Sequence, residues 1–378
     1  MRNILILISF SVALKVSYLL FSFFFLDNGN ENRTLLNEYV SIAKKNDSFW
    51  YEKITKEGYS KIKHKSDLGF SHGKNFKQSE WAFFPFYPYT IIICAKFFNF
   101  NFNESAFFLN IVFSILSIIG LYWFGLIFYN NHSIAFLNSL IMFCFPFSFY
   151  FSMFYTEAIF FTLIIFSFIA VYYHRLLILG ILLIPLVLIR PNGIFVTFPL
   201  FFYFLEHNKV LTKNKFAWHE ILKLKTLKHS SVFLFAPITF ILFCIYQYLM
   251  TGYFFAFSIA QHGWYREFTF PFLSFFRKGD FSTQFNSFFA LAVLVYAVIV
   301  RKKLPFSLNT FIWISLLLPL CSGSVMSMTR FVSVIFPLFL IFSQSVYKAN
   351  YKYFVLLILI SLHYLSFYGW IINNPISY

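Results

Sequence analysis

Long apolar runs alternate with short polar connections along almost the whole chain. The first run, residues 3–26, is about 24 residues long, enough for an α-helix to cross a bilayer core. It is longer than the apolar core of a signal peptide and no small-residue cleavage site follows it, so we expect it to be retained. Ten further runs of spanning length are residues 105–129, 133–150, 157–173, 176–190, 192–206, 231–251, 283–300, 305–321, 331–346 and 353–373. The pattern predicts an all-α polytopic membrane protein with about eleven transmembrane helices.

One apolar stretch is predicted not to cross the membrane. The sequence AFFPFYPYTIIICAKFF, residues 82–98, is short, and Pro85 and Pro88 interrupt its start. Irregular backbone of this kind is tolerated at a membrane where it is covered by protein. We therefore expect an interfacial or re-entrant helix here.

The basic residues of the short loops predict the orientation. Short cytoplasmic loops are enriched in Lys and Arg, whereas long loops are translocated whatever their charge. With residues 82–98 left out of the spans, the basic short-loop positions all fall on one side. They are Arg2, Arg175, the lysines of residues 209–228, Arg301, Lys302, Lys303, Lys348 and Lys352. The N-terminus is then cytoplasmic, the C-terminus is outside, and residues 27–104 and 252–282 form two outer loops of a single domain, residues 1–378.

Composition agrees with a membrane protein and argues against other classes. Hydrophobic residues make up 59% of the chain and charged residues 12%, which no single soluble core of this length could bury. The net charge of +16 is spread over loops and membrane edges, so we expect no nucleic-acid partner.

Metal and nucleotide motifs are absent from the sequence. None of the nine histidines forms an HExxH pattern, and the four cysteines show no CxxC spacing. No GxGxxG or P-loop sequence occurs. We therefore predict no metal and no cofactor.

Polar residues at the ends of predicted spans and in the outer loops collect on the outer side. Such residues commonly line a cavity or meet a partner, because polar groups are costly in hydrocarbon. A carboxylate can take the proton of an acceptor hydroxyl, arginines can hold a phosphate, and aromatic faces suit a sugar or a polyprenyl chain. The candidates are Asp47, Trp50, Glu80, Tyr155, Glu157, Arg190, Asn192, Gln261, Trp264, Arg266 and Arg330. Together they favour glycosyl transfer from a lipid phosphate, although each could also be an interfacial anchor.

Lys15 lies near the middle of the first predicted span. A charge there costs roughly 2.5–3.5 kcal/mol on insertion scales. We therefore expect its side chain to face the interior of the bundle. The sequence alone does not identify the residue that pairs with it.

Several motifs occur in an order typical of one family. The stretches are NDSFWYEKITKEGY, EWAFFPFYP, FPFSFYFSMFYTEAIF, RPNGIF, TGYFFAFSIAQHGW and MSMTRFVSVIFPLF. In this order they resemble motifs of the PIG-V family of GPI mannosyltransferases and its bacterial relatives, within the GT-C class of membrane glycosyltransferases. Asn46 stands where the family commonly has Trp, and Tyr253 where bacterial relatives often carry Asp.

The resemblance implies a GT-C-type bundle with a large first outer loop that carries interfacial helices. It also implies an enzyme that moves a sugar, usually mannose, from a polyprenyl-phosphate donor to a lipid- or glycan-linked acceptor on the non-cytoplasmic side. We expect Asp47 to be the general base, Glu80 and Glu157 to orient acceptor or sugar, and Arg190, Arg266 and Arg330 to stabilise the leaving phosphate.

Two other functions fit the same composition. The chain could be a transporter or flippase of lipid-linked sugars, or a non-catalytic subunit of a glycosylation complex. The Phe, Lys, Asn and Ile bias favours the inner membrane of an AT-rich bacterium. An endoplasmic reticulum membrane is the alternative, because Asn32 and Asn103 begin glycosylation sequons.

Overall fold

The computed structural model describes most of the chain as helices. The described residues are 2–25, 34–62, 64–69, 77–212, 217, 223–276 and 279–377, and they contain no strands. The Asn32 sequon and residues 213–216 and 218–222 of the basic 209–228 stretch lie outside them. The prediction of an all-α chain is confirmed for this part of the protein.

The chain divides into two compact units, each assembled from distant segments. Unit 1 comprises residues 1–56, 87–165 and 339–378, and unit 2 comprises residues 57–86 and 166–338. Two helices contribute to both units, α7 (Glu157–Tyr172) and α17 (Phe336–Lys348).

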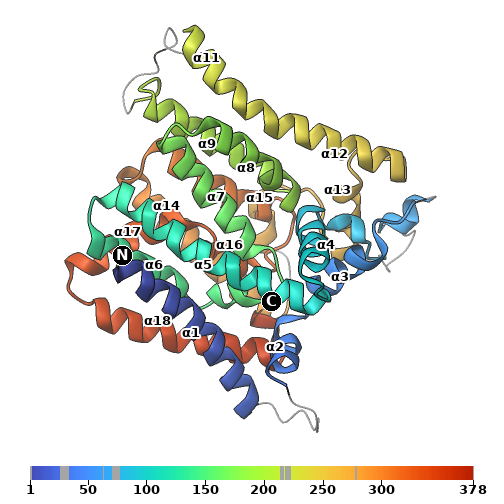
Figure 1. Cartoon of the computed structure of the whole chain (residues 1–378), viewed down its shortest axis with the longest axis horizontal. Helices are drawn as coiled ribbons and strands as arrows, with labels where there is room; N and C mark the ends of the chain where they lie inside the picture. The colour runs from blue at the N-terminus through green and yellow to red at the C-terminus, as the bar shows by residue number, and fades with distance from the viewer. Residues whose placement is uncertain are drawn as a thin grey trace. The chain divides into compact units, whose positions relative to one another are not determined.

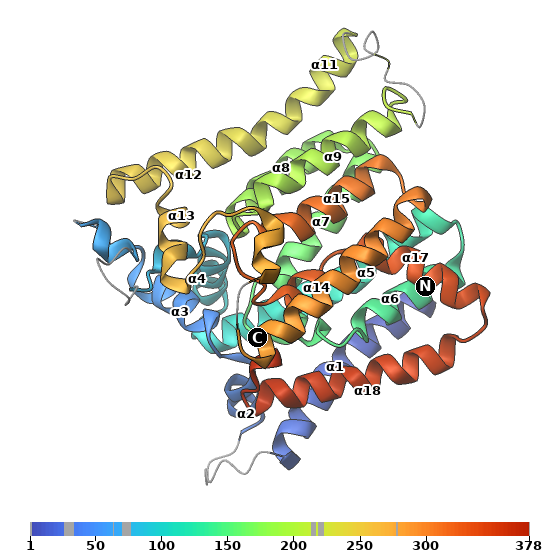
Figure 2. The ribbon, with the colours of Figure 1, turned by 180° about the vertical axis from the view of Figure 1, so that it is seen from behind.

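Unit 1 contains the first and the last helices of the chain. Figures 1 and 2 show α5 against α6, and α1 running beside α18. Besides its part of α7 and α17, unit 1 contains α1 (Arg2–Phe25), α2 (Leu35–Ala43), α3 (Asp47–Glu57), α4 (Phe86–Phe98), α5 (Phe102–Tyr129), α6 (His132–Phe143), η3 (Ser148–Ser152) and α18 (Lys352–Ile371). Helices α3 and α4 each extend one residue beyond the unit.

Unit 2 is built around α8, α9, α12 and α15, which lie side by side (Figure 1). Its helices are η1 (Lys65–Leu68), η2 (Glu80–Ala82), α8 (Leu176–Ile189), α9 (Gly193–His207), α11 (Leu224–Ser230), η4 (Ser231–Leu234), α12 (Phe235–Thr251), α13 (Ala256–Ala260), η5 (Gln261–Trp264), η6 (Pro271–Phe276), α14 (Phe281–Val300), η7 (Arg301–Lys303), α15 (Phe306–Leu320) and α16 (Met328–Val332).

Five described helices are long and apolar enough to cross a membrane. They are Arg2–Phe24, Phe102–Tyr129, Thr226–Thr251, Phe281–Lys303 and Lys352–Ile371. The other apolar helices are shorter, with 10 to 17 residues. The chain is thus built as an integral membrane protein, whereas the expected number of eleven spans remains a prediction.

Two predicted spans are not single helices. Residues 133–150 become α6, which ends at Phe143, followed by the 3-10 turn η3. Residues 331–346 are divided between α16, which ends at Val332, and α17. Apolar runs conceal such breaks, because hydrophobicity alone does not report where a helix ends.

The excluded stretch 82–98 begins at the last residue of the 3-10 turn η2 and then forms the helix α4 of 13 residues. At 1.5 Å per residue α4 is about 20 Å long, against about 30 Å for the hydrocarbon core. This length agrees with an interfacial or re-entrant helix.

Local capping explains the boundary between α5 and α6. Asn101 and Glu104 form a capping box at the start of α5, with bonds of 3.0 and 2.8 Å. Asn130 ends the helix in the left-handed region at φ 51°, which Asn tolerates, and Asn131 caps α6. The NN pair therefore makes a tight turn between two antiparallel helices.

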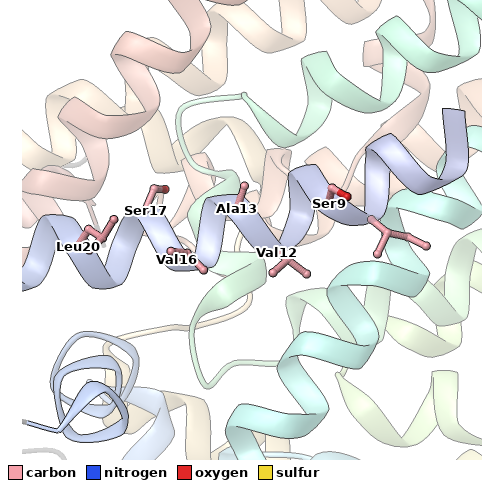
Figure 3. A pocket seen from close by; sticks show the side chains of 7 residues that line it. Ser9, Val12, Ala13, Val16, Ser17 and Leu20 are labelled. Atoms are coloured by element: carbon pink, nitrogen blue, oxygen red, sulfur yellow. The ribbon is translucent and has the colours of Figure 1, made fainter. Parts of the chain in front are cut away.

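Helix α1 buries polar residues among apolar ones and exposes mostly apolar residues. Ser11, Lys15 and Ser22 are buried, whereas Leu5 is 60% exposed and Leu20 is 50% exposed. An exposed apolar face of this kind suits a helix whose outer face meets lipid. Figure 3 shows a shallow hollow on that helix, lined by Ile8, Ser9, Val12, Ala13, Val16, Ser17 and Leu20.

Lys15 faces the interior, as predicted, and is 4% exposed. Its ammonium donates hydrogen bonds to Asn110 Oδ1 at 2.6 Å and to Ser152 Oγ at 2.9 Å. Asn110 also donates to the Met153 carbonyl at 2.6 Å, and Tyr39 Oη donates to Asn110 Oδ1 at 3.4 Å. The charge is thus held by neutral oxygens from α5 and from the segment before α7.

The segment between α6 and α7 is irregular and, from residue 147 to 156, buried throughout. Backbone groups outside a helix need protein partners where water is absent. Side chains of α2, α5 and α18 supply them. The pairs are Ser114 Oγ with Phe151 O at 2.6 Å, Asn110 Nδ2 with Met153 O at 2.6 Å, His363 Nδ1 with Phe145 O at 2.8 Å, and Tyr39 Oη with Ser152 O. We call residues 144–156 the capped break.

Substituting both members of the Lys15–Asn110 pair should cost less than the sum of the single substitutions. Asn110→Leu leaves the ammonium and the Met153 carbonyl short of a partner, with an expected loss of about 1–3 kcal/mol. In Lys15→Met with Asn110→Leu the ammonium is gone, so the losses should not add. Unfolding free energies in mixed micelles measure this cycle, with the lipid-facing Val16→Met as control. Additive losses would contradict the pairing.

Candidate functional site

Unit 1 has a basic end and a motif end. Asn3 Nδ2 bonds Tyr122 Oη at 3.2 Å, and Lys15 bonds Asn110, so α1 and α5 are antiparallel. The ring of Tyr18 lies 5.7 Å from that of His363, and the ring of Phe21 lies 6.2 Å from that of Tyr368, so α1 and α18 are parallel. The basic end carries Arg2, Lys348 and Lys352, at the start of α1, the end of α17 and the start of α18. The motif end carries Asp47, Trp50, Tyr155 and Glu157.

Unit 2 has the same two ends. Ser307 Oγ donates to the Glu206 carboxylate, so α15 begins where α9 ends. Arg175, His207, Lys228 and Arg301–Lys303 therefore share the basic end. At the opposite end, the backbone of Glu267 and Thr269 bonds the carbonyls of Ser322 and Cys321 at 3.1 and 2.8 Å. This motif end carries Glu80, Arg190, Asn192, Gln261, Trp264, Arg266 and Arg330.

Asp47 is the first residue of α3 and is half-buried. Asn46 before it adopts φ 48°, so the chain turns sharply from α2 into α3. Tyr155 Oη donates to the Lys45 carbonyl at 3.0 Å, and Phe154 N donates to the Ala43 carbonyl at 3.0 Å. These bonds join the segment before Asp47 to the segment before Glu157.

Lys45 and Trp370 hold this corner to the end of α18. The ammonium of Lys45 donates to the carbonyls of Trp370 at 2.9 Å and Ile371 at 3.0 Å, and to Asn373 Oδ1 at 2.9 Å. Trp370 Nε1 donates back to the Ile42 carbonyl at 2.7 Å. A cation is favoured at the C-terminal end of a helix, where carbonyls lack partners. Partial burial lowers the pKa of Lys45 below its ordinary value.

Helix α3 is held to α2 by an ion cluster. Glu52 accepts from Lys44 Nζ at 2.7 Å and from Lys56 Nζ at 3.0 Å. Burial alone would raise the pKa of Glu52, but these two ammonium groups lower it below its usual value. The helix that begins with Asp47 is therefore fixed to the end of α2 through Glu52, which lies more than one turn beyond Asp47.

Glu157 is fully buried at the start of α7. Nearby, Tyr51 and Tyr87 pack edge to face with centroids 5.0 Å apart. Burial first, and then the neighbouring Tyr51, Tyr39 and Glu157, raises the pKa of Tyr87.

In unit 2, Glu80 is 4% exposed, and its Oε1 accepts bonds from Ser60 N at 3.1 Å and from Ser60 Oγ. Trp81 Nε1 donates to the Ser60 carbonyl at 3.1 Å, and Tyr59 Oη to the Phe83 carbonyl at 2.7 Å. The GYS and EWAFF sequences are therefore joined by four hydrogen bonds.

The QHGW sequence packs onto the same cluster. Gln261 Nε2 donates to the Ala82 carbonyl at 3.4 Å, and the rings of Trp264 and Phe83 lie 5.4 Å apart. A Cβ at Gly263 would lie 2.9 Å from Gln78 Cα, so only glycine fits this contact. Three motifs that are distant in the sequence thus meet at the motif end of unit 2.

The RPNG sequence forms the turn between α8 and α9. Arg190 is buried and extended, with φ −154°, and Gly193 N bonds its carbonyl at 2.9 Å. A Cβ at Gly193 would lie 1.9 Å from the Leu186 carbonyl oxygen, which excludes any larger residue. Asn192 is half-buried at the start of α9.

The remaining two arginines lie in adjoining connections of unit 2. Arg266 follows η5 and is half-buried, directly before the pairing of residues 267–269 with 321–322. Arg330 is in α16, with its guanidinium carbon 5.9 Å from the centre of the Phe331 ring.

Comparison with known proteins gives no identification. No protein-family model matches the chain, and no curated protein matches it. Among the described residues, no group of three or more His, Cys, Asp or Glu side chains could hold a metal ion.

Sequence reasoning missed the residues that hold the candidates in place. Lys45, Ser60 and Trp370 make bonds that fix the segments of Asp47 and Glu80. Lys45 directly precedes the stretch NDSFWYEKITKEGY and Ser60 directly follows it, so their places at the two ends of this motif were the available signal. Trp370 is about 320 residues from Asp47, and no local pattern could have linked the two.

Removing the Lys45 and Trp370 bonds should loosen the segment that leads to Asp47. Trp370→Phe keeps an aromatic ring but loses the bond to Ile42, and Lys45→Met loses the bonds to α18. A net hydrogen bond contributes about 1 kcal/mol, so amides of residues 42–51 should exchange about five-fold faster in either variant. Hydrogen exchange with mass spectrometry measures this. Trp123→Phe and Lys352→Met are matched controls. Unchanged exchange of these amides in both test variants would show that the Lys45 and Trp370 bonds do not hold the segment.

Proposed function

We propose that the chain is a membrane glycosyltransferase. It takes a sugar, with mannose the first candidate, from a polyprenyl-phosphate donor and transfers it to a hydroxyl of a lipid- or glycan-linked acceptor on the non-cytoplasmic face. The observation that carries the proposal is that, in each unit, the end with the basic short loops is opposite to the end with the motifs. All the candidate residues of a unit share its motif end, and the positive-inside rule assigns basic short loops to the cytoplasm.

In the proposed reaction, Asp47 accepts the proton of the acceptor hydroxyl. The hydroxyl oxygen forms a bond to the anomeric carbon of the sugar as the bond from that carbon to the donor phosphate breaks. This single displacement inverts the anomeric carbon. The phosphate leaves with the polyprenyl chain, and its growing charge is stabilised by arginines, among which Arg190 is our first candidate.

The contacts of the other candidates favour more specific roles. The Glu80 carboxylate holds Ser60, so we assign it to positioning of the first-loop motif. Glu157 and Tyr155 lie beside the segment of Asp47 and would orient the acceptor. Trp50, Trp264 and Gln261 offer aromatic and amide surfaces that suit a sugar or a prenyl chain, and Asn192, Arg266 and Arg330 would contact the donor phosphate.

A flippase or transporter of lipid-linked sugars is the second candidate. Transporters usually place their binding groups near the bilayer midplane. Here the one charge near the middle of α1, Lys15, bonds Asn110 and Ser152 in the capped break, and the other candidates lie at helix ends. This distribution favours transfer chemistry at a membrane surface. A non-catalytic subunit of a glycosylation complex is the third candidate.

We propose the inner membrane of a bacterium as the location, on the AT-rich residue bias, with the endoplasmic reticulum membrane as the alternative.

Asp47→Asn should lower kcat for sugar transfer by about 10²–10⁴-fold, because the amide cannot accept the proton. Binding of the donor should change little. The measurement is transfer from a radiolabelled polyprenyl-phosphate mannose in proteoliposomes. Asp67→Asn, an exposed acid of the same loop that pairs with Lys77, is the matched control.

Transfer by Asp47→Asn at the wild-type rate, with an unchanged melting temperature, would rule out Asp47 as the base. Movement of the labelled lipid across the vesicle without transfer, in the wild-type protein, would instead support the flippase. Unchanged cellular glycan in both Asp47→Asn and Arg190→Ala cells would support the non-catalytic subunit.

A further inference from the structure

A groove lies between α8 and α12 in unit 2, away from the motif end. One wall is α8, with Leu177, Ile181 and Ile184, and the other is formed by η4 and the start of α12, with Phe235. Leu177 is 79% exposed and Ile181 is 60% exposed. An exposed apolar groove on a membrane protein is a surface for a hydrocarbon chain.

Helix packing sets the floor of this groove. Gly180 faces the other wall, and a Cβ there would lie 3.1 Å from Val232 Cγ2 and 3.5 Å from the Phe235 ring. The glycine lets α8 approach η4 closely at one point, while Ile181 and Ile184, further along α8, stay exposed. The groove is therefore a fixed feature of how the two helices meet.

One end of the groove is basic. Lys228 and His229 line it, next to the hydroxyl-bearing Ser231, and Arg175 directly precedes its first residue, Leu176. The described lining residues include no Asp or Glu. The groove also starts at the N-terminal turn of α8, and the positive end of the helix dipole adds to the positive potential of these basic residues. A group that carries negative charge is thus complementary to this end.

With the orientation that the positive-inside rule predicts, the basic end of the groove faces the cytoplasmic leaflet. Lys228 belongs to the basic end of unit 2, which the sequence places on the cytoplasmic side. From Leu177 to Ile184 the groove runs along about 10 Å of helix, against about 15 Å for the hydrocarbon of one leaflet. This length suits the upper part of one acyl chain.

We propose that this groove is a binding site for an anionic diacyl phospholipid of the cytoplasmic leaflet. The phosphate and headgroup lie against Lys228, His229 and Arg175, and one acyl chain lies along Ile181, Ile184 and Phe235. A zwitterionic lipid would place its ammonium beside these cations and bind more weakly. The site is at the end opposite to the proposed sugar transfer and does not depend on it.

The test uses the full-length protein in detergent, stripped of lipid and titrated with phosphatidylglycerol or phosphatidylcholine. Native mass spectrometry counts the bound lipids. Each basic residue near a charged headgroup contributes a factor of about five to binding. The pair Lys228→Gln with His229→Gln should therefore lower the phosphatidylglycerol affinity at least five-fold and leave phosphatidylcholine binding unchanged. Added salt should weaken the wild-type complex.

Two further variants separate the groove from general charge. Lys302→Gln with Lys303→Gln removes two charges at the same end of unit 2, outside the groove, and should keep wild-type binding. Ile181→Trp fills an exposed part of the groove and should weaken binding while all charges remain. The proposal would be overturned if both double variants lost phosphatidylglycerol affinity equally, or if the wild-type protein bound both lipids with equal affinity. A preference of the wild-type protein for polyprenyl phosphate would also overturn it.

Discussion

Hydrocarbon offers no hydrogen bonds, so every backbone group that leaves a helix inside this protein must be satisfied by another part of the chain. The capped break meets that requirement with side chains from helices that are widely separated in the sequence. Asn110, Ser114 and His363 each donate to one of its carbonyls, and the Lys15 ammonium bonds Ser152 beside them. The break carries the chain to the motif end of unit 1, where Tyr155 meets Lys45.

This constraint explains why a few polar residues occur inside apolar helices. Lys15 and Asn110 would be costly in lipid, yet in the folded protein each serves as partner to the other and to the break. The apolar face of α1 points away from this network. The same helix therefore meets lipid on one side and a polar interior on the other.

Much of the helical plan could be predicted from apolar runs, and the details that position the candidates could not. The length of residues 3–26 and the prolines at 85 and 88 correctly predicted the long helix α1 and the short helix α4. The cost of a charge in lipid correctly predicted that Lys15 faces inward. The divisions at Phe143 and Val332 were not foreseen, because their residues are as apolar as those of the helices around them. The Glu80–Ser60 bonds and the contact of Gly263 with Gln78 depend on tertiary packing, which local patterns do not contain.

The hydrogen bonds between Lys45 and the end of α18 also bear on how the protein is made. The segment before Asp47 is synthesised more than 300 residues ahead of the Trp370 indole and the Ile371 carbonyl that hold it. Unit 1 can be completed only after α18 has been made. A nascent chain without α18 would carry Asp47 on a corner that lacks these bonds, so this corner takes its final form late in synthesis.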